Sequence, residues 1–73
     1  MIAAAVQMNS QADKAANLQT AERLVREAAS AGAELVLLPE KFNALGNTKD
    51  YFAAAETLTG ETIALCSALA KEF

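Results

Sequence analysis

The sequence predicts an α/β fold that opens with a βαβ unit. Two short apolar runs, Ile2–Val6 and Leu35–Leu38, are continuous rather than alternating, which is typical of parallel strands buried on both faces. A stretch with helical periodicity lies between them, and a second one occupies residues 61–72. Two strands joined by one helix form a right-handed crossover and run parallel, so their carboxyl ends meet at one edge of the sheet.

The first strand is expected from Ile2 to Met8, and its alanines imply close packing by neighbouring elements. The turn-forming residues Asn9-Ser10-Gln11 end it. A helix follows from about Lys14 to Ala31. Asp13 is a suitable N-cap because its carboxylate can accept from an amide of the first turn, and Gly32 suits the C′ position, where φ is positive.

The two faces of this helix differ in character. Apolar or small residues recur at steps of three and four, with Leu24 widening the stripe that they form: Leu18, Ala21, Val25, Ala28 and Gly32. The opposite face carries the pairs Glu22–Arg26 and Arg23–Glu27 at i,i+4 spacing. We interpret these charges as a solvent-exposed face, and we expect this helix to have a structural role.

The second strand, Leu35–Leu38, ends at Pro39, which has no amide hydrogen to donate to a sheet. Glu40 therefore follows the carboxyl end of a parallel strand, where open α/β sheets place their ligands. Asn9 falls at the same edge. This position suits a catalytic acid or base, and the alternative is a solvated glutamate in a turn.

Residues 41–60 show no strong periodicity. Gly46-Asn47-Thr48 indicates a loop, and a short helical turn is expected from Asp50 to Glu56. A polar, irregular stretch after the strand that carries Glu40 is a suitable place for substrate contacts. Tyr51 is the candidate substrate-binding residue there, although simple packing of this aromatic ring is the alternative.

A last helix is expected from Glu61 to Glu72, with Thr59 or Thr62 as its cap. Glu61 favours the first turn through the helix dipole. One apolar face is expected on this helix, flanked by Leu65 and Leu69 and made of Ile63, Cys66 and Ala70.

Composition limits the possible partners and compartments. The chain has 73 residues with 6 basic and 9 acidic side chains, a net charge of −3 and no basic cluster, which argues against nucleic acid. No apolar run approaches the ~20 residues of a membrane span, and the apolar start lacks the basic region of a signal peptide. One cysteine without an export signal suits the cytoplasm. No cofactor is expected, and no histidine is present to build a typical zinc site.

The chain is short for an independent fold. A single cysteine permits no disulfide, and domains of this size without such links have marginal stability. A parallel sheet of only two strands also leaves unpaired edges on both sides. We therefore expect residues 1–73 to be the amino-terminal portion of one larger domain, with the remainder of that domain absent.

Several motifs resemble the amino-terminal segment of the nitrilase superfamily of carbon–nitrogen hydrolases. The resemblance covers all 73 residues, about the first quarter of such a protein. It is carried by Ala4-Ala5-Val6-Gln7-Met8, Asn17-Leu18, the segment Ala31–Glu40 with its LVLLPE run, Phe42, and Thr59-Gly60-Glu61. The residues from Leu38 to Gly46 look most like bacterial amidases of the deaminated-glutathione and ω-amidase type.

The resemblance implies a four-layer αββα sandwich, of which this chain holds the incomplete βαβ opening. It also implies a Glu–Lys–Cys catalytic set in which Glu40 is the general base. In the family, a cysteine thiolate attacks an amide carbonyl or nitrile carbon, ammonia or an amine leaves, and water completes the hydrolysis. A thiol needs a base to form the thiolate, and the lysine would stabilise the oxyanion.

The chain contains no residue that matches the family's lysine or cysteine, which come from later segments. Cys66 is expected to be a small core residue, because it lies on the apolar side of a helix. Lys41 is expected to be an exposed loop lysine, with a role in the substrate pocket as the alternative. Glu40 is therefore the only catalytic residue that the sequence identifies, and the activity belongs to the parent protein.

The expected function is part of an amidase that hydrolyses a small non-peptide amide through a cysteine acyl-enzyme. Nitrilase activity is less favoured, since most members are amidases. No partner besides the small-molecule substrate is expected, except a second copy in a homodimer of the full-length protein. Two other classes stay open: a non-catalytic nitrilase-like subunit, and a small interaction module that docks its exposed sheet edge onto a partner.

Overall fold

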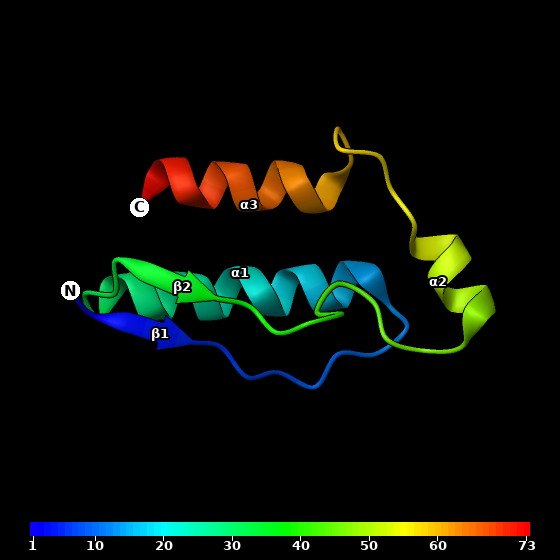
Figure 1. The fold of residues 1–73 in the computed structure, drawn as a ribbon, viewed down its shortest axis with the longest axis horizontal. Coiled ribbons are helices and arrows are strands. Elements are labelled where there is room, and N and C mark those ends of the chain that lie inside the picture. The colour runs from blue at the N-terminus through cyan, green and yellow to red at the C-terminus, as the bar shows by residue number, and fades with distance from the viewer.

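The structure is a computed structural model that describes all of residues 1–73. Its elements are β1 (Ala3–Ala5), α1 (Lys14–Ser30), β2 (Leu35–Leu37), α2 (Thr48–Ala54) and α3 (Glu61–Glu72). Figure 1 shows α3 running alongside α1, with α2 beyond the carboxyl ends of the two strands. The predicted βαβ unit is confirmed, because β1 and β2 pair in parallel around the α1 crossover.

Both strands are shorter than predicted. Ala3, Ala4 and Ala5 pair with Leu35, Val36 and Leu37 respectively. The last bond between the strands runs from the Val6 amide to the Leu37 carbonyl, at 2.9 Å. Beyond this bond the two segments separate into loops, since Pro39 follows closely and offers no amide hydrogen.

The ends of α1 are as predicted. The Asp13 carboxylate accepts from the Ala16 amide at 3.2 Å. At the other end, Gly32 has φ +99°, and its amide donates to the Ala29 carbonyl at 3.0 Å. The amide after it donates to the Ala28 carbonyl, which completes a Schellman motif. A glycine is needed here because other residues rarely adopt this φ.

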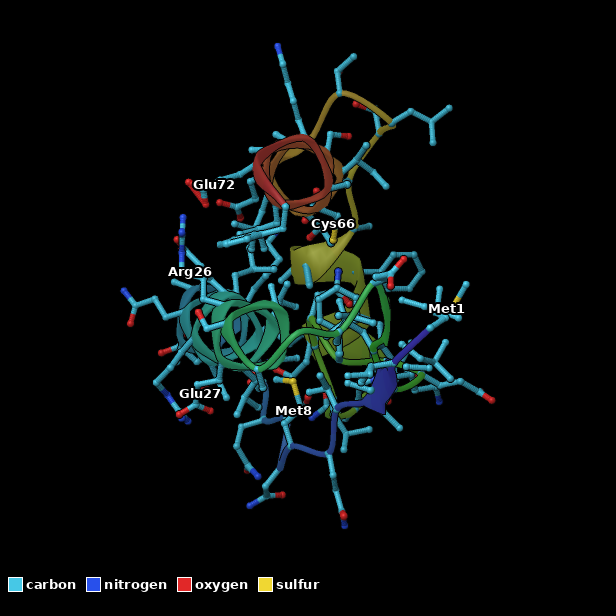
Figure 2. All side chains as sticks on the ribbon, turned by 90° about the vertical axis from the view of Figure 1, so that its left-hand side faces the viewer. Met1, Met8, Arg26, Glu27, Cys66 and Glu72 are labelled. Atoms are coloured by element: carbon cyan, nitrogen blue, oxygen red, sulfur yellow. The ribbon has the colours of Figure 1, made fainter.

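The core lies along the apolar stripe of α1. Leu18 and Ala21 are buried there, and Leu69 of α3, which packs against α1, is buried as well. The polar face of α1 is also as predicted, with Arg26 to Glu22 at 3.1 Å and Arg23 to Glu27 at 3.7 Å. Figure 2 shows Arg26 and Glu72 facing one another across the two helices, where they form a further ion pair.

The predicted burial of β2 on both faces is wrong for this chain. Leu35 and Leu37 are 57 % and 68 % exposed, and Ile2 beside them is also exposed. The cause is that α1 covers only the face that carries Val36, which meets Val25 around a hollow between the sheet, α1 and α3. The opposite face of the sheet has no covering element within residues 1–73.

Helix α3 has the predicted bounds, but its predicted cap and its apolar face need correction. Its N-cap is Gly60, not Thr59 or Thr62, and glycine has no side chain to cap with. The face turned to α1 carries buried Leu69 with half-buried Leu65 and Cys66, whereas Ile63 and Ala70 are exposed. The reason is that α3 packs mainly against α1, which covers only a narrow stripe of it.

Helix α2 begins and ends two residues earlier than predicted. The Asn47 side chain accepts from the Asp50 amide at 3.0 Å, and the Asp50 carboxylate accepts from the Asn47 amide at 3.0 Å. This capping box moves the first helical residue to Thr48. None of the three helices combines the length and apolar character that a membrane span needs.

Candidate functional site

Glu40 lies in the turn that follows β2, at the edge where both strands end (Figure 1). Its side chain is exposed, and the ion pairs of the chain use other carboxylates. Lys41 follows it with φ +53°, a left-handed conformation that a lysine seldom adopts. Such a backbone persists only where its surroundings enforce it, and two anchors do so here.

The two anchors flank the stretch 38–41. On one side, the Leu37 carbonyl accepts from the Val6 amide at 2.9 Å. On the other side, the Ser10 hydroxyl donates to the Phe42 carbonyl at 2.7 Å, and Ser10 is only 6 % exposed. Both partners come from the segment that follows β1. The turn that carries Glu40 is thus held between β1 and the loop after it.

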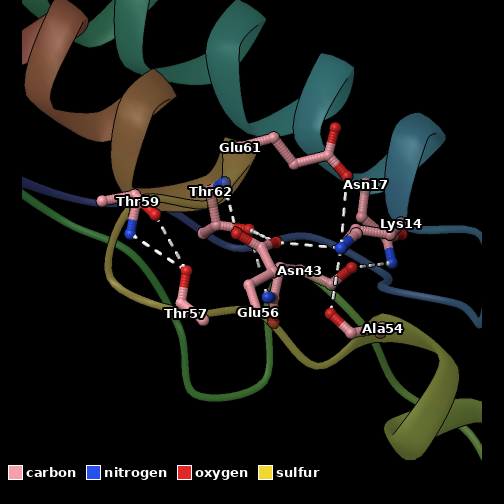
Figure 3. Close-up of polar contacts among 9 residues, drawn as sticks. All are labelled: Lys14, Asn17, Asn43, Ala54, Glu56, Thr57, Thr59, Glu61 and Thr62. Atoms are coloured by element: carbon pink, nitrogen blue, oxygen red, sulfur yellow. Dashed lines mark hydrogen bonds and ion pairs between the residues drawn. The ribbon is translucent and has the colours of Figure 1, made fainter.

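Asn17 strengthens the second anchor. This residue is 4 % exposed, and its Nδ2 donates to the Gln11 carbonyl at 2.7 Å and to the Asn43 carbonyl at 2.9 Å, the latter drawn in Figure 3. Its Oδ1 accepts from the Gln11 amide at 3.0 Å. One side chain therefore joins the loops that follow β1 and β2. We call Ser10 and Asn17 the loop clamp.

Sequence reasoning missed the loop clamp. The sequence pattern indicates Ser10 only as a turn former and Asn17 only as part of a motif. The signal that could have found Asn17 is its place one turn before Ala21, on the buried stripe of α1. A polar side chain there needs hydrogen-bond partners, and nearby loop carbonyls supply them.

A second polar cluster fastens the ends of the three helices, as Figure 3 shows. The Lys14 ammonium contacts Glu56 at 3.0 Å, Glu61 at 3.2 Å and the Ala54 carbonyl at 2.9 Å. The Glu56 carboxylate accepts from the Thr62 amide at 2.8 Å and also from the Thr62 hydroxyl. Glu56 thereby satisfies the first turn of α3, which Gly60 cannot cap.

The charged partners in this cluster change one another's pKa. Hydrogen bonds from Thr62, followed by the Lys14 ammonium, lower the pKa of Glu56 to about 2. The hydrogen bond to Glu56 in turn raises the pKa of Lys14. The side chains of Glu56 and Lys14 are 11 % and 19 % exposed, so solvent competes little for these bonds.

We expect acid to weaken the protein through Glu56. Its pKa is about 2 when folded against a usual 4.5, so its contribution is complete above pH 4.5 and is lost as the pH falls towards 2. Glu56→Gln should lower stability at neutral pH and flatten the decline between pH 4.5 and 2. The measurement is the unfolding midpoint of the complete protein against pH. Glu34→Gln, at an exposed site, is the control, and an equally steep decline in Glu56→Gln would contradict this role.

Tyr51 and Lys41 come together beside the turn. The Lys41 ammonium lies 5.1 Å from the centroid of the Tyr51 ring. Both line a hollow of about 280 Å³ that is completed by Asn43, Ala44, Ala54 and Ala55. Glu40, next to Lys41 in the chain, does not line this hollow. Phe52, the neighbouring aromatic residue of α2, is exposed and also takes no part in it.

Cys66 lies in a different environment. It points from α3 towards α1 and the sheet (Figure 2), where it lines the hollow of about 380 Å³ together with Val36 and Leu69. Burial raises the pKa of its thiol. A thiol in such surroundings forms little thiolate at neutral pH and is a poor nucleophile. Its surroundings are those expected of a small packing residue.

Comparisons with known proteins find one matching family and several relatives. The family model described as carbon-nitrogen hydrolase matches residues 2–73. The chain is 46 % identical over 59 residues to omega-amidase NIT2-B of Xenopus laevis. These 59 residues are 81 % of this chain and 21 % of that protein. It is 40 % identical over 72 residues to deaminated glutathione amidase of Synechocystis sp. These 72 residues are 99 % of this chain and 26 % of that protein.

A third relative, omega-amidase NIT2 of Danio rerio, is 42 % identical over 69 residues, or 94 % of this chain and 25 % of that protein. The chain thus spans about a quarter of the length of the curated relatives that it matches. No solved structure matches it at comparable significance.

Proposed function

This chain belongs to the carbon–nitrogen hydrolase family, and we propose that it forms the amino-terminal segment of an amidase whose general base is Glu40. The observation that carries this proposal is the placement of Glu40. Its carboxylate is exposed at the carboxyl edge of a parallel sheet, on a stretch anchored at both ends. The relatives bear amidase names, which supports an amide rather than a nitrile as substrate.

In the proposed reaction, the Glu40 carboxylate takes the proton from a cysteine thiol, and the thiolate attacks the amide carbonyl. The C–N bond then breaks, and the proton returns from Glu40 to the leaving ammonia. Glu40 next takes a proton from water, whose oxygen attacks the acyl-enzyme. The C–S bond then breaks, the acid leaves, and the proton returns from Glu40 to the cysteine sulfur. One positioned carboxylate can serve both half-reactions, because each begins with removal of a proton.

The nucleophile and the lysine of this scheme are assigned to residues outside 1–73. Within the chain, Cys66 is unsuited because of its burial and its raised pKa. Lys14 is unsuited as an oxyanion stabiliser because Glu56 and Glu61 already occupy its ammonium. Tyr51 is proposed to contact the substrate, since its ring lines the hollow beside the Glu40 turn.

An interaction module is the second candidate, and one observation favours it. Ile2, Leu35 and Leu37 expose a continuous apolar face of the sheet, which an isolated 73-residue product would need to cover with a partner. In the amidase proposal the remainder of the same domain covers this face. The expected homodimer and the cytoplasmic location stay predictions.

The complete protein tests the proposal by its activity. Its intact mass and the sequence after Phe73 would be determined first, and ammonia release would then be measured from a panel of small aliphatic amides, charged and neutral. The proposal expects a later lysine and cysteine and turnover of at least one amide. A complete protein that lacks this cysteine, or that hydrolyses no amide at high enzyme concentration, would leave the interaction module or the non-catalytic subunit.

A further inference from the structure

Glu40 is held in place by the backbone around it rather than by its own side chain. Its carboxylate is exposed and forms no ion pair within residues 1–73. The stretch 38–41 also takes part in no hydrogen bond within these residues. The position of Glu40 within this chain therefore depends on the two anchors that flank the stretch, the Leu37 carbonyl and the Phe42 carbonyl.

Only one of the two anchors is made by a side chain. At Leu37 the partner is the Val6 backbone amide. At Phe42 the partner is the Ser10 hydroxyl, which donates at 2.7 Å from 32 positions away in the chain. Ser10 is 6 % exposed, so water competes little for the Phe42 carbonyl. A substitution at Ser10 can therefore release this end of the turn without changing any residue of the turn itself.

The bond to Phe42 also bears on the conformation of Lys41. Lys41 is the one non-glycine residue of the chain with a positive φ, at +53°, and it lies between Glu40 and the anchored Phe42. An L residue is less stable in this region than at a negative φ, so the turn relaxes unless its surroundings prevent it. A change of φ at Lys41 would turn Glu40 relative to Phe42. The Ser10 hydroxyl opposes this change from the next residue.

A general base tolerates little displacement, since it must lie within hydrogen-bond reach of the proton that it takes. We propose that Ser10 is a positioning residue: its buried hydroxyl keeps the turn after β2 in the strained conformation that places the Glu40 carboxylate for proton transfer. The inference rests on the proposed amidase function and adds to it a residue that acts through Glu40 without touching the substrate.

The test measures kcat and KM of the complete protein on its best small amide substrate. Ser10→Ala removes the hydroxyl but little volume, so the turn loses one anchor while the packing around it changes little. We expect kcat to fall about 10-fold, which is less than the ~10²-fold cost of a 1 Å displacement because the Leu37 anchor remains. KM should not change, because the buried hydroxyl is engaged with the Phe42 carbonyl rather than with substrate.

Gly32→Ala is the control for lost stability. Gly32 has φ +99° and precedes β2 at the end away from Glu40, so alanine there strains the backbone without touching the turn. Its kcat should equal that of the unaltered protein at a temperature well below both unfolding midpoints. If Ser10→Ala does not fold, Ser10→Cys replaces it. A thiol is a weaker donor of similar size and should give a smaller fall in kcat at unchanged KM.

A second substitution distinguishes positioning from a general loss of structure. Asparagine adopts the left-handed region more readily than lysine does, so Lys41→Asn lowers the strain that the Ser10 hydroxyl has to hold. In the Lys41→Asn background, Ser10→Ala should lower kcat by less than about threefold, against about 10-fold in the unaltered background. Both proteins of each comparison carry the same residue 41, so any direct contact of that residue with substrate cancels.

The outcomes separate this inference from the function on which it rests. The role of Ser10 is overturned, while the amidase function stands, if Ser10→Ala leaves kcat unchanged or lowers it equally in both backgrounds of position 41. An equal fall of kcat in Gly32→Ala overturns it as well. If the complete protein hydrolyses no amide, or if Glu40→Gln retains near-normal turnover, the proposed function itself fails.

Discussion

Under the proposed function, replacing Glu40 by glutamine is expected to lower the turnover of the complete protein by a factor of about 10²–10⁴, the usual contribution of a general base. The amide keeps the size and shape of the side chain but cannot accept the thiol proton. Glu40 is exposed and forms no ion pair within the chain, so the fold should not change. The measurements are kcat on the best amide substrate and the thermal unfolding midpoint.

Glu34→Gln provides the matched control for this variant. Glu34 is also exposed, and it precedes β2 at the end of the strand away from the edge that carries Glu40. The same change of charge there should leave kcat within twofold of the unaltered protein. Near-normal turnover in Glu40→Gln would remove Glu40 from the mechanism, whatever Glu34→Gln does.

Replacing Asn17 by alanine is expected to lower the free energy of unfolding by about 2–4 kcal/mol. The change removes three hydrogen bonds between 2.7 and 3.0 Å and leaves the Gln11 amide and the Asn43 carbonyl without these partners. Asn17 is 4 % exposed, so water cannot readily replace the lost side chain. Denaturant unfolding of the complete protein measures the loss.

The control for this variant is Asn9→Ala. The Asn9 side chain accepts only from the exposed Gln11 side chain, so its loss should cost less than about 0.5 kcal/mol. Asn17→Asp tests the direction of the bonds, because it keeps an acceptor for the Gln11 amide but sets a carboxylate against two carbonyls. It should be no more stable than Asn17→Ala. Equal stability of Asn17→Ala and Asn9→Ala would contradict the loop clamp.

The elements that sequence patterns predicted well are those whose signals are local. The stripe of α1, its Asp13 cap and the glycine at its end all lie within one continuous stretch, and the structure confirms each. The parallel pairing of β1 and β2 followed from the handedness of crossovers rather than from any long-range contact. The position of Glu40 after β2 also follows from a local signal, since Pro39 marks the end of the strand.

The features that sequence patterns did not predict depend on partners distant in the chain. The N-cap position of Gly60 is an exception, since Glu56, only four residues earlier, reaches the first turn of α3 and would clash with a Cβ at Gly60. Lys14 contacts that carboxylate from 42 positions away, which no pattern within one helix reveals. The hydrogen bonds of Asn17 to the loop after β2 have the same character. The role of Tyr51 stays a prediction.

The double anchoring of residues 38–41 constrains the length of this stretch but not the side chain at position 41. The length of this stretch is constrained, since an inserted or deleted residue would move Phe42 out of reach of the Ser10 hydroxyl. The side chain at position 41 is free of that constraint because the anchors use only backbone carbonyls. The residue at position 41 can therefore be exchanged while the turn, and Glu40 within it, keeps its position.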